Sequence, residues 1–133
     1  MQYDITLIGS YTKDTIITPS ATKHVDGGGF NYGAHAAIAL DAKTAAITRL
    51  NKNDNHVVKN LENLGVDVFP TFTPDSTEIK LTYPTNDWDN RTLIMSKSAG
   101  SFSANQFDDI DSKIFCVAGF MLLHKSILVS EQV

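Results

Sequence analysis

The chain has 133 residues, of which 42% are hydrophobic and 20% charged, and this length fits one domain with a buried core. A net charge of −4 and scattered Lys and Arg residues exclude the basic surface that nucleic-acid binding requires. The apolar runs are too short to span a bilayer, and the single Cys116 with no signal-peptide pattern predicts a cytoplasmic protein without an internal disulfide.

The N-terminal part of the chain predicts two core strands, one hairpin and an Ala-rich helix. Apolar alternation ending at Gly9 predicts the first strand, and β-branched runs around Pro19 predict the hairpin at a sheet edge. In chain order we expect a strand at 3–8, hairpin strands at 15–18 and 22–25, a helix at 30–40 and a strand at 43–50.

The remaining residues predict a second helix, a second hairpin and further strands. Asp54 is interpreted as the N-cap of a helix over 55–64, and Gly65 as the residue that ends it. Pro70 is expected to end the strand that follows this helix. In chain order we expect strands at 66–69, 77–83, 91–96 and 114–118, then a helix over 121–129.

The alternation of core strands and helices predicts an α/β fold with a mostly parallel sheet and helices on its faces. The two hairpins do not fit this alternation. We therefore expect them to form a small separate sheet that projects from the sandwich.

The segment Asp26-Gly27-Gly28-Gly29 leads directly into the Ala-rich helix and is a candidate ligand site. Glycines allow close backbone approach, and a helix N-terminus presents unpaired N–H donors. Asp14 follows the first strand and adds a carboxylate. On its own it is more typical of a residue that caps a turn, and the order of the surrounding elements is what favours a ligand contact. The glycines are also consistent with a simple tight turn, and the four His residues lack the spacing of metal ligands. Arg91 and Lys97 are either phosphate contacts or exposed strand charges.

These features resemble the N-terminal half of the ribokinase or PfkB carbohydrate-kinase family. The resemblance lies in Leu7-Ile8-Gly9-Ser10 with Asp14, in Gly27-Gly28 and the helix after it, and in Asp41–Ile47, Asn53-Asp54, Leu64–Asp67 and Ala99-Gly100. It implies a three-layer α/β/α sandwich over residues 1–133, with lid strands near 15–25 and 77–97.

The resemblance also implies roles for five residues. Asp14 would accept hydrogen bonds from substrate hydroxyls, and Gly27 and Gly28 would join lid to sandwich beside the substrate. The family often has an Asn at the position of Tyr32, whereas Asn31 lies one residue earlier, so either side chain is the expected contact.

The family is more than twice as long, and its later half supplies the nucleotide site and the catalytic base. The chain therefore resembles a truncated substrate-binding half of a kinase that uses ATP and Mg²⁺ to phosphorylate a sugar or nucleoside. We expect the isolated chain to be inactive and to self-associate through its open sheet edges. The alternative is a non-catalytic polyol-binding or dimerisation module.

Overall fold

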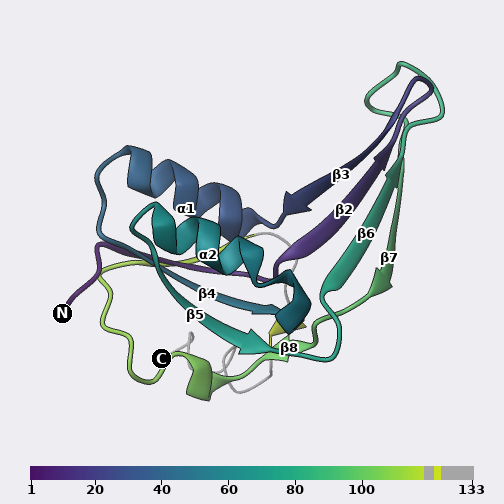
Figure 1. Ribbon diagram of the computed structural model, residues 1–133. Helices are drawn as coiled ribbons and strands as arrows, with labels where there is room; N and C mark the ends of the chain where they lie inside the picture. Colours follow the sequence, from purple (N-terminus) through teal and green to yellow (C-terminus); the bar gives the residue numbers. More distant parts are fainter. Residues whose placement is uncertain (119–121, 124–133) are drawn as a thin grey trace.

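The computed structural model describes residues 1–118 and 122–123, which form three sheets and two α-helices (Figure 1). The strands are β1 (Ile5–Ile8), β2 (Thr12–Ile17), β3 (Thr22–Gly27), β4 (Thr44–Leu50), β5 (Asp67–Phe72), β6 (Thr77–Thr82), β7 (Thr92–Lys97), β8 (Ser101–Phe102), β9 (Phe115–Val117) and β10 (Leu122–Leu123). The helices are α1 (Gly29–Ala39) and α2 (His56–Asn63), and short 3-10 turns cover Lys52–Asp54 and Ala104–Gln106.

The main sheet has the strand order β5-β4-β1-β9, and every described pair in it is parallel. Helices α1 and α2 lie side by side on one face of this sheet (Figure 1). The core beneath them contains Leu7, Phe30, Leu50 and Leu61. On the opposite face, Ile8 and Ile47 pack against Phe102. The predicted α/β fold with a mostly parallel sheet is confirmed.

Helix α1 packs very closely over β1 because its residues are small. A Cβ atom at Gly33 would lie 2.7 Å from the Leu7 Cδ1 atom, so no larger residue fits there without displacing Leu7. After the helix, Asp41 adopts a positive φ of 60°. Gly65, with a φ of 98°, follows α2 as predicted.

The second sheet projects from this body, in the order β3-β2-β6-β7 (Figure 1). Strands β2 and β3 form one antiparallel hairpin, and β6 and β7 form the other. The hairpins are joined by parallel pairing of β2 with β6. The prediction that both hairpins share a small projecting sheet is therefore confirmed.

Three local predictions need correction. Asp14 lies inside β2, because this strand begins at Thr12 rather than at the expected residue 15. Strand β5 continues through Pro70, which pairs opposite Thr48; β5 is an edge strand of the described sheet, where a proline is tolerated. Of the expected helix over 121–129, only Leu122 and Leu123 lie within the described residues, and they form a strand beside β8.

Asp54 is not the N-cap of α2 either. The N-cap is Asn55, which makes no side-chain cap hydrogen bond. The Asp54 carboxylate instead accepts a hydrogen bond from Ser76 Oγ at 2.6 Å and lies 3.2 Å from Lys13 Nζ. The Asp54 carboxylate therefore binds residues distant in sequence rather than the N–H groups at the start of α2.

The packing of α2 generates a stability prediction. Leu61 lies on the buried face of α2 and is fully buried, whereas Leu64, at the end of the same helix, is 47% exposed. Leu61→Ala should lower the free energy of unfolding by about 2–5 kcal/mol, and Leu64→Ala by less than about 0.5 kcal/mol. Urea denaturation of both variants measures the difference. Equal losses would contradict the burial of this helix face.

Candidate functional site

Asp14, Gly27 and Gly28 meet at the root of the projecting sheet, where β3 ends and α1 begins. A Cβ atom at Gly27 would lie 2.2 Å from the Asp14 Oδ2 atom, so this carboxylate rests directly against the glycine backbone. Gly28 has a φ of 100°, and a Cβ there would lie 2.6 Å from the Ser10 carbonyl oxygen. The glycine pair thus makes room for Asp14 and for the turn into α1.

One oxygen of the Asp14 carboxylate lacks a hydrogen-bonding partner. Its Oδ1 atom is buried and has no partner within the described part of the chain. Burial raises the pKa of Asp14 above its ordinary value, and the nearby charge of Asp26 acts in the same direction. A hydrogen bond from Thr12 opposes this rise in pKa without cancelling it. Asp14 is therefore an acceptor with unused capacity.

Strand alternation gives the projecting sheet two different faces. The Asp14 face carries the side chains in register with Asp14, and a hollow of about 270 Å³ lies on it. This hollow is bordered by Thr12, Asp14, Gly28, Gly29, Ile79, Leu81, Arg91 and Leu93. Apolar side chains of β6 and β7 thus border the same hollow as a carboxylate and glycine backbone.

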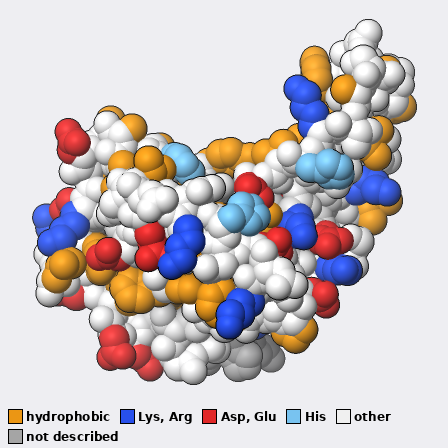
Figure 2. Space-filling view, in the orientation of Figure 1, with side chains coloured by type: hydrophobic (Ala, Val, Ile, Leu, Met, Phe, Trp, Pro, Cys, Tyr) orange, Lys and Arg blue, Asp and Glu red, His pale blue; other side chains and the backbone are white. Residues whose placement is uncertain are grey.

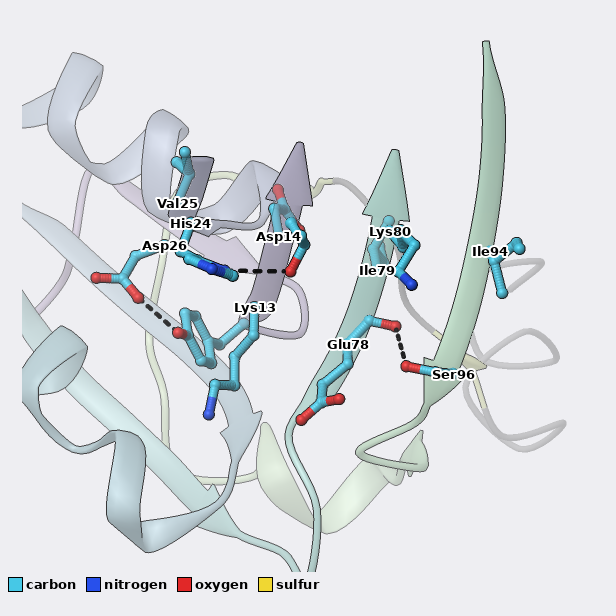
Figure 3. A pocket seen from close by; sticks show the side chains of 12 residues that line it. Lys13, Asp14, His24, Val25, Asp26, Glu78, Ile79, Lys80, Ile94 and Ser96 are labelled. Carbon is cyan, nitrogen blue, oxygen red and sulfur yellow. Dashed lines mark hydrogen bonds between the residues drawn. The ribbon is translucent and has the colours of Figure 1, made fainter. Parts of the chain in front are cut away.

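The opposite side, the Lys13 face, is polar and has a larger hollow of about 550 Å³ (Figure 3). Its bordering residues include Lys13, His24, Asp26, Glu78 and Lys80, and Asp14 and Ile79 border this hollow as well.

Most of the charges on the Lys13 face already have partners. Lys13 lies 3.2 Å from the Asp54 carboxylate, and Glu78 lies 3.6 Å from Lys97 Nζ. Asp26 accepts a hydrogen bond from the Tyr11 hydroxyl and lies 2.9 Å from His56 Nε2. These contacts connect the root of the sheet to the start of α2.

The smaller hollow is the better candidate site. On the Lys13 face the acids and bases largely satisfy one another, whereas on the Asp14 face a buried carboxylate oxygen has no partner among the described residues. A buried acceptor without a partner costs free energy, which a ligand with hydroxyl groups can recover.

Asn31 and Tyr32 lie in the first turn of α1 but differ in environment. Asn31 is buried, and its Nδ2 atom donates to the Asp26 carbonyl oxygen at 3.4 Å. Tyr32 is 57% exposed. Neither residue borders the hollow on the Asp14 face, so their predicted substrate contacts remain untested.

The apolar border of the site was not predicted. Ile79, Leu81 and Leu93 reach the hollow because β6 pairs with β2, more than 60 residues earlier in the chain. Alternation within 77–82 and 92–97 indicates which residues share a face. The sequence holds no signal for the register that brings them beside Asp14.

Positive and negative side chains are interspersed on the face seen in Figure 2, which is hollowed between the helices and the projecting sheet. Within residues 1–118 and 122–123, no three His, Cys, Asp or Glu side chains are grouped to hold a metal ion. In the same part of the chain, no helix has the length and apolar character to cross a membrane.

Comparison with solved structures identifies the fold. A pyrophosphate-dependent kinase in the ribokinase family superposes with a TM-score of 0.83 at 24% identity, covering 97% of this chain and 47% of that one. The Methanocaldococcus jannaschii nucleoside kinase gives a TM-score of 0.67 at 12% identity, covering 86% and 44%. Arabidopsis thaliana ribokinase, solved with ribose and ATP, gives 0.62 at 14% identity, covering 81% and 42%.

The chain therefore has a ribokinase-like fold and spans about half the length of these kinases. No protein-family model and no curated protein sequence matches the chain.

The raised pKa of Asp14 generates a prediction about stability and pH. Below pH 3.8, the ordinary pKa of this carboxyl, both folded and unfolded chains hold the proton. Because the folded chain holds this proton more tightly than the unfolded chain, the protonated carboxyl favours the folded state at low pH. This contribution to stability is lost as the pH rises through the raised pKa of the folded state. Wild type should therefore lose stability relative to Asp14→Asn between pH 3 and pH 7.

Urea denaturation at several pH values measures this relative change. The exposed Asp109 provides the control, because Asp109→Asn should show a much flatter difference from wild type. A difference for Asp14→Asn that does not vary with pH would show that Asp14 is well solvated.

Proposed function

We propose that this chain binds a small polyol, either a sugar or a nucleoside, on the Asp14 face. We further propose that it is the substrate-binding part of an enzyme that transfers a phosphoryl group to a substrate hydroxyl. The observation that carries the proposal is the buried Asp14 oxygen without a partner, resting against Gly27 at the root of the projecting sheet. The ribokinase-like fold supports it, since the neighbours named above are kinases.

The chemistry of Asp14 suits a polyol. An ionised carboxylate only accepts hydrogen bonds and offers about four acceptor positions, so it can hold two adjacent hydroxyls. Hydrogen bonds to a charged group are worth about 1.5–3 kcal/mol each. Orienting the hydroxyls in this way positions one of them for reaction.

The projecting sheet is proposed to act as a lid. Its Asp14 face carries Ile79, Leu81 and Leu93 beside the hollow, and these apolar side chains would cover the carbon skeleton of a bound polyol. Closure of such a cover excludes water from phosphoryl transfer. Gly27 and Gly28 lie where this sheet meets the body, so they are the proposed hinge.

The phosphoryl donor of the complete enzyme is proposed to be ATP with Mg²⁺. Three of the similar structures are of pyrophosphate-dependent kinases, so pyrophosphate is the competing donor. The residues described here do not fit a metal site, because they bring no three suitable ligands together. We therefore assign no catalytic step to them and propose that the chain alone does not catalyse transfer.

A non-catalytic module is the second candidate function. The observation that favours it is the exposed apolar strand β7, in which Leu93, Ile94 and Met95 are 40%, 58% and 47% exposed at the edge of the projecting sheet. Such an edge is suited to pairing with another strand.

The polyol site is tested by Asp14→Asn, which keeps the size of the side chain but weakens it as an acceptor. Affinity for a polyol drawn from ribose, myo-inositol and adenosine should fall by at least about tenfold, or 1.4 kcal/mol. Titration calorimetry measures this affinity, with circular dichroism to check folding. Glu78→Gln is the matched control, because Glu78 borders the other hollow and should leave the affinity unchanged. A loss of affinity with Glu78→Gln but not with Asp14→Asn would place the polyol site on the Lys13 face and contradict the proposal.

Self-association is the second prediction from this proposal. The edge strand β7 lacks charged residues between Thr92 and Met95, so two copies can pair through it. Sedimentation should show a dimer or larger species, and Ile94→Lys should shift it toward monomer. Thr22→Lys on the opposite edge strand β3 is the control and should have little effect. A monomer at high concentration would contradict the pairing.

A further inference from the structure

Charge changes sign along the Asp14 face of the projecting sheet. At the root, Asp14 is in register with Ile79 and Met95. One rung further out, Ile16 pairs with Lys23 on β3 and with Leu81 on β6. Directly opposed residues share a face, so Lys23 lies on the same side of the sheet as Asp14. The root of this face is thus acidic and its outer part basic.

Arg91 adds a second positive charge to the outer part. It borders the same hollow as Asp14, together with Leu81 and Leu93. Its Nη1 atom donates to the Tyr83 hydroxyl at 3.2 Å, and the Tyr83 ring packs edge-on against Trp88 with 5.0 Å between ring centres. The Tyr83 hydroxyl thus holds one end of the guanidinium, and Arg91 borders the hollow.

The remaining donors of Arg91 are suited to an anion. A guanidinium has five N–H donors in a planar fork that matches carboxylate and phosphate oxygens, and the bond to Tyr83 uses one of them. No ion pair to Arg91 is found in the described part of the chain. A charged ligand can therefore bind it without breaking an existing salt bridge.

The spacing of the two charges indicates the length of the ligand. Arg91 immediately precedes β7 and lies four residues before Met95, which corresponds to about 13 Å along the strand direction. The long Arg91 side chain shortens this gap, since it borders the hollow that also contains Asp14. A ligand that meets both groups must extend past the Leu81 and Leu93 rung.

We infer that the ligand of the Asp14 face is a polyol that carries an anionic group, either a phosphate ester or a carboxylate. Its hydroxyls bind Asp14 at the root of the sheet, and its anionic group binds Arg91 in the outer part. Repulsion by Asp14 and attraction by Arg91 and Lys23 set this one orientation. The inference depends on the proposed polyol site and makes Arg91 a specificity-determining residue within it.

Titration calorimetry of the chain at low ionic strength tests the inference with four probes: ribose, ribose 5-phosphate, gluconate and inorganic phosphate. At least one of the two anionic polyols should bind about tenfold more tightly than ribose. Arg91→Gln should remove this advantage, measured as the ratio of the affinities for the anionic polyol and for ribose. Lys80→Gln, which removes a positive charge from the Lys13 face, should preserve the advantage.

The outcomes separate this inference from the proposed function. Ribose binding that depends on Asp14, with no advantage for either anionic polyol, overturns the inference and leaves the polyol site standing. An advantage that persists in Arg91→Gln also overturns it, as does inorganic phosphate binding as tightly as ribose 5-phosphate. Failure of every polyol to bind overturns both proposals. Tighter binding of an anionic polyol than of ribose, abolished by Arg91→Gln and preserved in Lys80→Gln, supports both the polyol site and this inference.

Discussion

The contact between the Asp14 carboxylate and the backbone of Gly27 is the constraint on which the candidate site depends. With 2.2 Å between Asp14 Oδ2 and the position of a Cβ at residue 27, no other residue fits there without moving the carboxylate. Burial raises the pKa of Asp14, and its Oδ1 atom has no partner among the described residues. The fold therefore bears the cost of a desolvated acid at one defined place.

The root of the projecting sheet tolerates this cost because it is held from the other side. Strand alternation sends Lys13, next to Asp14, toward Asp54, whose carboxylate also accepts a hydrogen bond from Ser76. Asp26, next to Gly27, is held by Tyr11 and His56. Strands β2 and β3, which carry Asp14 and Gly27, are thus anchored to the body through the residues adjacent to these two.

Local sequence patterns predicted much of the fold, since apolar alternation, an Ala-rich segment and glycine at helix ends are properties of neighbouring residues. They also identified Asp14 and Gly27 as residues of interest. They could not predict that the Asp54 carboxylate contacts Lys13 and Ser76 instead of capping α2, or that β6 pairs with β2. Both facts depend on contacts between segments far apart in the chain, where parallel pairing leaves no turn signal.

The difference between the two faces of the projecting sheet connects stability to function. The Lys13 face forms a larger hollow, yet its charges are mostly neutralised by one another and by the body, so they serve to hold the sheet. The Asp14 face has an acid at its root and the cations Lys23 and Arg91 further out, with apolar side chains between them. Charges that were placed only for stability would be expected to pair directly. The separation of these opposite charges by apolar side chains instead suits a ligand that carries hydroxyl groups at one end and an anionic group at the other.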